Sequence, residues 1–418
     1  MVPVTKTIGE IQARVARGEA VVYTAAELKE LAREGEKISV ENVDVVTTGT
    51  FGVMSGTLAI LHVPVSGPGS FNRAEKAWLN GVPAIPGPCP NERLGSADLV
   101  VFGTSRADDS YGGGHLFRDL VAGSPVEVEI EAEGRTFTRS VSLKELDSAR
   151  LITTRSAFKN YGGFINRNPG EVRTIFSVMG LSGPSEELSF SGCGDINPLQ
   201  NDPSLMSIGV GTRILLNGGI GYILGQGTRS IGDKPNISAS ADMHRMIPEM
   251  MGGFVTSQGP ECTSSVAVPI PVLNETILSQ LLVTNEEIPL PVSDINDRIP
   301  VATSHYGEVW NGTDLTVTYS PDSCIRCEEC EAAKYCPTGA ISPHIGIDPC
   351  LCVNCGTCVK ACPGGAFHGY LGNVLVGQSK VPVTLRQSDR SRALRLCEYL
   401  RDLILDKKFQ VNAKLEDL

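Results

Sequence analysis

Hydrophobic residues recur at helical spacing near both ends of this chain. Near the N-terminus, Thr7 with Glu10 and Thr24 with Glu27 each have the spacing of a capping box, so we predict two helices there. Residues 388–408 have the pattern of an amphipathic helix. Its predicted inward face consists of Leu394, Cys397, Leu400, Leu403 and Ile404. Cys397 is therefore expected to be a core residue.

Between these ends, alternating apolar and polar residues predict strands. Residues 126–141 alternate around Gly134, as in a hairpin with one wet face. The glycine-rich residues 209–227 predict strands with close backbone approach. Residues 43–48 predict a strand that enters a glycine-rich turn over 49–56. Such a turn either gathers N–H groups around an anion or simply precedes a core segment. We expect a mixed α+β large domain, whose fold the sequence leaves open.

Eight cysteines in the last quarter of the chain form two interlocked runs. Each run is Cys-x-x-Cys-x-x-Cys, closed by a further Cys-Pro, which is typical of bacterial ferredoxins. In that pattern the fourth cysteine of one run ligates the cluster of the other run. The sequence therefore predicts two [4Fe-4S] clusters with two ligand sets. They are Cys324, Cys327, Cys330 with Cys362, and Cys352, Cys355, Cys358 with Cys336.

The alternatives for these cysteines are disulfides or zinc. Zinc favours two separated cysteine pairs over triplets closed by Cys-Pro. The first run departs from the pattern because five residues, 331–335, separate Cys330 from Cys336. Cys350 lies outside the pattern and is expected to be a bystander. We predict a large domain over residues 1–318, a ferredoxin-like 2[4Fe-4S] domain over 319–370, and a C-terminal strand and helix over 371–418.

The composition limits which partners and which cellular compartment are expected for this protein. The chain has 418 residues, 13 cysteines and a formal net charge of −11. The acidic balance argues against nucleic-acid binding, which needs concentrated Lys and Arg. No apolar run approaches the ~18 residues of a membrane span, and the N-terminal sequence lacks the apolar segment of a secretory signal. We expect a cytoplasmic protein whose cysteines serve metal or thiol chemistry.

Three cysteines of the large domain lie outside any apolar periodic run. Glycines flank Cys193, so backbone amides and a substrate could approach its sulfur, and we take Cys193 and Cys89 as candidate catalytic thiols. Cys262 is a weaker candidate. His115, expected in a loop, is a candidate proton donor or an ordinary surface residue. Four arginines could grip an anionic substrate, and the sequence does not choose among them: Arg155, Arg213, Arg229 and Arg245.

Several stretches together resemble the homocysteine-biosynthesis (HcyBio) family over roughly residues 1–318. They are 44–52 (DVVTTGTFG), 76–80 (KAWLN), 111–121 (YGGGHLFRDLV), 197–202 (NPLQND), 208–212 (IGVGT) and 268–273 (VPIPVL). With the fused two-cluster module, the chain resembles the branch called methanogenesis marker protein 16. The resemblance implies sulfur incorporation, in which an aldehyde and sulfide become a thiol. The founding case makes homocysteine from aspartate semialdehyde, and the marker branch looks like the version that makes coenzyme M from sulfoacetaldehyde. Homocysteine-forming members carry cysteines at the positions of Ser55 and Ala157 in this chain.

The electron balance independently fits this class of reaction. Sulfide adds to an aldehyde and water leaves, but two electrons and two protons are still needed to reach the thiol. Two one-electron clusters on the same chain provide that route without nicotinamide. We expect a small anionic aldehyde, sulfide or a persulfide donor, and an external low-potential electron donor as partners. A homo-oligomer is compatible with the sequence.

Two other readings remain open from the sequence. In one, the protein is a non-catalytic electron-transfer or assembly subunit, and its large domain is a docking platform. In the other, it is a carrier that hands sulfur to another protein.

Overall fold

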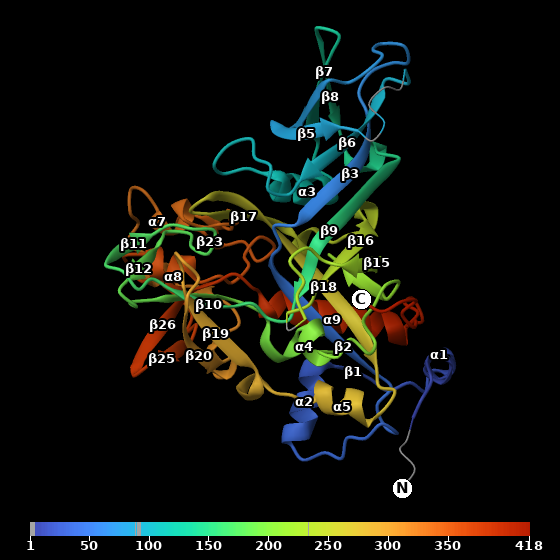
Figure 1. The fold of residues 1–418 in the computed structure, drawn as a ribbon. Helices are drawn as coiled ribbons and strands as arrows, with labels where there is room; N and C mark the ends of the chain where they lie inside the picture. The colour runs from blue at the N-terminus through green and yellow to red at the C-terminus, as the bar shows by residue number, and fades with distance from the viewer. Residues whose placement is uncertain (1–4, 88, 90–92, 233) are drawn as a thin grey trace.

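A long sheet, built from strands of residues 22–271, runs through most of the molecule (Figure 1). The computed structural model describes residues 5–87, 89, 93–232 and 234–418. All neighbouring strands of this sheet pair antiparallel within the described residues, except β1 and β2, which are parallel. In spatial order the strands are β1 (Val22–Thr24), β2 (Val45–Val53), β18 (Gly259–Pro271), β14 (Arg213–Leu216), β15 (Gly219–Gln226), β16 (Asn236–Asp242), β9 (Ser148–Phe158), β3 (Thr57–Pro64), β6 (Ser96–Phe102), β5 (Val82–Pro86), β4 (Lys76–Leu79), β7 (Val126–Ala132) and β8 (Arg135–Val141), with β17 (Gly252–Thr256) added beside β18.

A second sheet joins segments that lie before and after the cysteine runs in sequence. Its order is β20 (Pro300–His305), β19 (Pro289–Asp294), β10 (Gly162–Ile165), β13 (Leu188–Ser191), β26 (Ser379–Arg386) and β25 (Asn373–Val376). After β26 the chain forms α9 (Arg390–Leu405), which packs along β2 and β18 of the main sheet. The C-terminal segment is therefore integrated with both sheets. The division of the chain at residues 318 and 370 stays a prediction.

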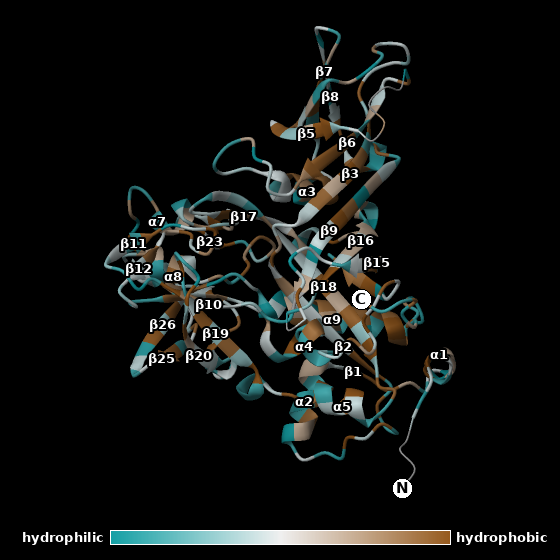
Figure 2. Ribbon diagram, in the orientation of Figure 1, coloured by the Kyte–Doolittle hydropathy of each residue, from teal (hydrophilic) through white to brown (hydrophobic). Residues whose placement is uncertain are grey.

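Short elements complete the described fold. The remaining helices are α1 (Ile8–Arg17), α2 (Ala25–Arg33), α3 (Gly113–Val121), α4 (Pro198–Asn201), α5 (Glu275–Leu281), α6 (Gly307–Trp310), α7 (Glu331–Lys334) and α8 (Thr357–Ala361). Three two-stranded ribbons pair β11 (Gly170–Val172) with β12 (Leu181–Gly183), β21 (Thr318–Tyr319) with β24 (Phe367–His368), and β22 (Ile341–Ser342) with β23 (Gly346–Ile347). Hydrophobic residues concentrate along the strands of the main sheet, as Figure 2 shows for β3 and β6. None of the described helices is both long and apolar enough to cross a bilayer.

The local sequence patterns predicted many of these elements. The mixed α+β class is confirmed, and so are the capping boxes of α1 and α2 and the hairpin of β7 and β8. The C-terminal helix is also confirmed, with Cys397 fully buried.

Two local predictions are wrong. β2 continues through the glycines to Val53, because Gly49 and Gly52 let α9 and the chain before it pack directly on the strand. A Cβ at Gly49 would lie 2.7 Å from the sulfur of Cys397. His115 lies in the first turn of α3, not in a loop. These glycines allow close packing: a Cβ at Gly113 would lie 2.1 Å from the backbone oxygen of Phe102.

Candidate active site and cluster-binding module

Four of the predicted cluster ligands surround one small cavity. They are Cys336, Cys352, Cys355 and Cys358, which come from both runs as the interlocked pattern requires. Backbone N–H groups point at two of the sulfurs: Ala340 N lies 3.2 Å from Cys336 Sγ, and Asn354 N lies 3.4 Å from Cys352 Sγ. Thiols sharing a cavity and backed by N–H donors fit an iron–sulfur cluster, whose sulfurs accept such bonds. We call this group the inner cysteine set.

The other four cysteines form an outer set, defined as Cys324, Cys327, Cys330 and Cys362, all partly exposed. Ala366 N donates to Cys362 Sγ at 3.4 Å, which repeats the relation of Ala340 to Cys336. His344 Nδ1 lies 3.6 Å from Cys324 Sγ, and this contact, with those of the Tyr319 hydroxyl and the Arg326 backbone, lowers the pKa of that thiol to about 7. The extra residues of the first run form α7, a single helical turn. Among the described residues, no three His, Cys, Asp or Glu side chains are placed to hold one metal ion.

The inner set lies directly against the large region. The carbonyl of Cys355 accepts a hydrogen bond from Arg386 N at 2.9 Å, at the end of β26. Val255 N in β17 donates to the carbonyl of Pro337 at 2.7 Å. The buried guanidinium of Arg392 donates to the carbonyl of Cys352 at 2.8 Å. Strands β17 and β26 and helix α9 therefore hold the segments that carry the inner set, while all four thiols of the outer set are partly exposed.

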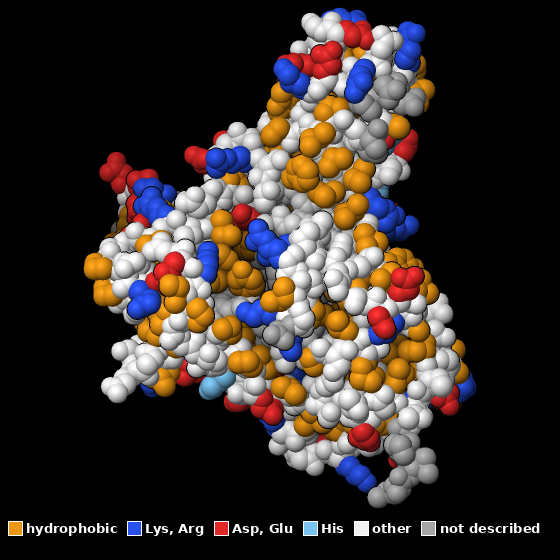
Figure 3. All heavy atoms as spheres, viewed as in Figure 1, with side chains coloured by type: hydrophobic (Ala, Val, Ile, Leu, Met, Phe, Trp, Pro, Cys, Tyr) orange, Lys and Arg blue, Asp and Glu red, His pale blue; other side chains and the backbone are white. Residues whose placement is uncertain are grey.

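A cavity of about 270 Å³ opens beside this contact, between the turn after β2, strand β9 and the second sheet. Figure 3 shows this side of the molecule hollowed between the lobe of β10 and β19 and the central strands, with basic side chains at the edge. The residues that matter for its chemistry are Ser55, Arg155, Tyr161, Arg229, Arg298 and Gln387. Gln387 directly follows Arg386, so the cavity wall lies one residue from the backbone contact with Cys355.

Three arginines, Arg155, Arg229 and Arg298, place positive charge on the cavity wall. Burial lowers the pKa of Arg155, and the like charge of Arg229 lowers it further. The guanidinium of Arg298 lies over Phe164 and Phe176, with its carbon 4.6 and 4.3 Å from the two ring centroids. Neighbouring cations in a partly desolvated cavity favour an anionic ligand.

The arginines named from the sequence thus separate into two groups. Arg155 and Arg229 line the cavity. Arg213 stacks over Phe409 at 5.2 Å, and Arg245 is exposed elsewhere. Sequence reasoning missed Arg298, because nothing in its local sequence marks it as a cavity residue.

Ser55 occupies the tight turn between β2 and β3, facing the cavity. A Cβ at Gly56 would lie 3.2 Å from Cβ of Arg155, so the glycine lets the turn pack against that arginine. The carboxyl of Glu261 in β18 interacts with the Ser55 hydroxyl and with the charge of Arg155. Ala157, the second position at which the resemblance implies a cysteine in homocysteine-forming members, is fully buried in β9.

The candidate thiols of the large domain do not line this cavity in the described part of the chain. Cys193 is fully buried, with its sulfur 3.6 Å from the carbonyl of Phe51, and burial raises its pKa. Burial also raises the pKa of Cys262, to about 12. Cys89 is exposed between β5 and β6, beside positions 88 and 90–92, which lie outside the described residues. A catalytic role for Cys193 or Cys89 stays a prediction.

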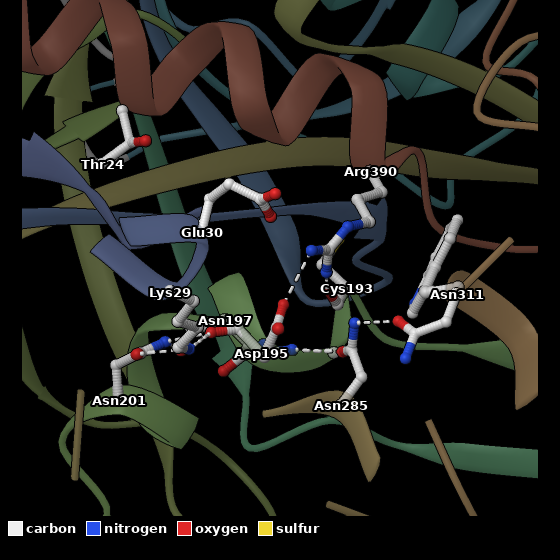
Figure 4. A network of polar contacts seen from close by, with 12 residues as sticks. Thr24, Lys29, Glu30, Cys193, Asp195, Asn197, Asn201, Asn285, Asn311 and Arg390 are labelled. Atoms are coloured by element: carbon white, nitrogen blue, oxygen red, sulfur yellow. Dashed lines mark hydrogen bonds and ion pairs between the residues drawn. The ribbon is translucent and has the colours of Figure 1, made fainter. Parts of the chain in front are cut away.

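A polar network holds the segment that carries Cys193 in place (Figure 4). The buried ammonium of Lys29 donates to the carbonyl of Asp195 and, at 3.1 Å, to Asn201 Oδ1. Arg390, at the start of α9, donates to Asp195 Oδ1 at 2.7 Å. Burial would raise the pKa of Asp195, but the charges of Arg390 and Lys29 hold it below its ordinary value. The network fixes the chain that follows Ser191, a residue of the cavity wall.

His115 and Cys350 lie together on a second cavity, of about 220 Å³, between α3 and the cysteine module. His115 Nδ1 accepts a hydrogen bond from Gly112 N at 3.2 Å, and burial lowers its pKa. The imidazole therefore caps its own helix. Cys350 is exposed and is not among the four thiols of the inner set.

Comparison of the sequence with known proteins places this chain in a family. Residues 20–411 match the family described as "Homocysteine biosynthesis enzyme, sulfur-incorporation". An uncharacterized protein of Methanothermobacter thermautotrophicus is 47% identical over 96% of this chain and 94% of its own length. The L-aspartate semialdehyde sulfurtransferase of Methanocaldococcus jannaschii is 33% identical over 82% of this chain and 68% of its own length.

The cysteine module has relatives of its own. The electron transport protein HydN of Escherichia coli is 46% identical over 19% of this chain and 47% of its own length. No solved structure matches the chain. The protein is a sulfur-incorporating iron–sulfur enzyme. It belongs to the family of sulfur-incorporating homocysteine biosynthesis enzymes.

Proposed function

We propose that this enzyme reductively thiolates a small anionic aldehyde, with sulfoacetaldehyde as substrate and coenzyme M as product. The observation that carries the proposal is the cavity with three arginines, whose wall adjoins the backbone that contacts the inner cysteine set. Conversion of aspartate semialdehyde to homocysteine is the alternative, motivated by the name of the relative from Methanocaldococcus jannaschii.

The arginines support an anionic substrate of small size. A sulfonate offers three oxygens to guanidinium groups, which bind oxyanions by paired hydrogen bonds. Arg155 is the most buried of the three, because it is partly buried while Arg229 and Arg298 are exposed. A cavity of about 270 Å³ lies below the usual range for drug-sized ligands, as a substrate of few heavy atoms requires.

The cysteine module supports a reductive step. The interlocked sets are the residues that would hold two [4Fe-4S] clusters, and when bound these would supply electrons one at a time. The chain's own contribution is a short connection. The carbonyl of Cys355 is hydrogen-bonded to Arg386 N, and the next residue, Gln387, lines the cavity.

The cavity wall supports free sulfide as the sulfur source. Its described residues include no cysteine, so in this proposal free sulfide adds to the aldehyde carbon and no protein persulfide is needed. The overall balance is aldehyde plus hydrogen sulfide, two electrons and two protons, giving the thiol and water. The arginines hold the anionic end, which leaves the aldehyde end toward Ser55 and Gln387.

The test is an anaerobic assay of the reconstituted protein with sulfide, a low-potential reductant and either aldehyde. We expect coenzyme M from sulfoacetaldehyde at a kcat/KM well above that for homocysteine from aspartate semialdehyde. Reversal of that preference would assign the alternative substrate. Thiol from neither aldehyde would refute the proposal. Added sulfur on a cysteine, found by mass spectrometry in such an inactive protein, would instead indicate a sulfur carrier.

A further inference from the structure

Glu261 and Ser55 form a pair of polar side chains beside the arginine cavity. Ser55 lines the cavity, and its hydroxyl interacts with the carboxyl of Glu261. One oxygen of that carboxyl, Oε2, is buried and has no hydrogen-bond partner among the described residues. A buried carboxyl oxygen without a partner is costly unless the group carries a proton or serves a reaction.

The surroundings favour the protonated acid. Burial raises the pKa of Glu261, and the Ser55 hydroxyl and the charge of Arg155 offset this only in part. Among the described residues, Arg155 is the charged group that acts on this carboxyl. A carboxylic acid that keeps its proton to higher pH is suited to donate it in a reaction.

The proposed reaction needs a proton donor before any electron arrives. Addition of sulfide to the aldehyde gives a thiohemiacetal, which carries an SH and an OH group on one carbon. Its OH must leave as water, and hydroxide is a poor leaving group without an acid. We propose that Ser55 and Glu261 form the proton-transfer pair for this dehydration, an inference that rests on the proposed function.

The step balances without a cofactor. The electron pair of the S–H bond forms the carbon–sulfur double bond, and the carbon–oxygen bond breaks with its pair on oxygen. That oxygen takes the Ser55 proton and departs as water, while Ser55 takes the proton of Glu261. The proton released from sulfur restores the Glu261 carboxyl. Ser55 thus touches the reacting oxygen, and Glu261 acts through it.

The arrangement depends on strand register. In the β2–β18 pair, Val53 lies opposite Thr263, so Glu261 extends past the pair toward the turn at Ser55. Gly56 keeps that turn against Arg155. The acid, the hydroxyl and the most buried cation of the cavity therefore come from two strands, β18 and β9, and the turn after β2.

The experiment compares Glu261→Gln, Glu261→Asp and Ser55→Ala with the wild-type holoprotein and with Glu127→Gln, a control at an exposed glutamate of β7. Each protein is assayed for thiol formation across pH, and its affinity for 2-hydroxyethanesulfonate, a non-reacting sulfonate, is measured by competition. We expect Glu261→Gln and Ser55→Ala to lose about 100-fold or more in kcat. Sulfonate affinity should change less than about threefold, because the arginines remain.

The pH profile separates a proton-transfer role from a structural one. Wild-type kcat should fall as pH rises through the pKa of Glu261, because the acid form is lost. Glu261→Gln should abolish that fall, and Glu261→Asp should restore part of kcat. An active wild type with unchanged kcat or an unchanged profile in Glu261→Gln overturns the pair but leaves the proposed function standing. A wild type that makes no thiol refutes the proposed function, and this inference with it.

Discussion

Replacing Arg155 by Gln tests the assignment of the anion-binding cavity most directly. The substitution removes one cation and keeps a side chain of similar length at the most buried of the three arginine positions. A hydrogen bond to a charged group contributes about 1.5–3 kcal/mol. At 4 Å the charge–charge attraction is about 1 kcal/mol in water and about 4 kcal/mol near a protein surface. Arg155 is partly buried, so its loss should cost between the value in water and the value near a protein surface. Since about 1.4 kcal/mol corresponds to tenfold, we expect kcat/KM to fall by about 10- to 150-fold.

The assay compares sulfoacetaldehyde with acetaldehyde, which has the reacting group but no anion. In Arg155→Gln the loss should fall on sulfoacetaldehyde, while kcat/KM for acetaldehyde changes by less than about threefold. Arg245→Gln, at an exposed arginine outside the cavity, serves as the matched control and should behave as wild type. Thermal unfolding of both variants excludes a general loss of fold. Equal losses for the two aldehydes would show that Arg155 does not bind the anion, and the reasoning would fail.

Three further outcomes are expected. Cys355→Ser should lose about half of the bound iron in a chemical iron assay, because it removes one inner thiol, whereas Cys350→Ser should keep the wild-type iron content. Cys193→Ser should retain most of the thiol-forming activity, since burial raises the pKa of its thiol; a loss above tenfold would instead support the catalytic role predicted from the sequence. Lys29→Met should change how stability depends on pH. Burial lowers the Lys29 pKa to about 8 from 10.5, so between these values the unfolded chain holds a proton that the folded chain has lost. The free energy of unfolding should rise by about 1.4 kcal/mol per pH unit there in wild type relative to Lys29→Met, as chemical denaturation would measure, and parallel curves would contradict this.

The sequence was most informative where function depends on residues close together in the chain. Two-residue gaps between cysteines bring thiols to one loop, and the structure gathers the inner set around one cavity. Capping boxes are equally local, and both N-terminal ones are confirmed. The prediction for His115 was wrong because a run of glycines is typical of a loop. In this structure the same glycines let helix α3 start against the backbone of β6.

The arginine cavity could not be predicted in the same way. Its chemistry comes from Ser55, Arg155, Arg229, Glu261 and Arg298, which lie on separate strands and loops. Their meeting depends on long-range strand pairing, such as β2 with β18, and on the fold-back of the second sheet. No local pattern specifies such register, so the sequence could name candidate arginines without choosing among them.

Position 55 connects the family resemblance to the cavity. The resemblance implies cysteines at positions 55 and 157 in homocysteine-forming members, and the structure separates the two positions. Ser55 faces the cavity, while Ala157 is fully buried in β9. A thiol at 55 could hold sulfur next to the bound aldehyde. A hydroxyl cannot hold sulfur as a persulfide, and the one found here interacts with the carboxyl of Glu261. In the proposed reaction sulfur arrives as free sulfide, and the cysteine module, which contacts Arg386, would supply the two electrons. A serine at position 55 and the use of free sulfide are therefore linked in the proposed reaction, because a side chain that cannot hold sulfur leaves sulfide to supply it.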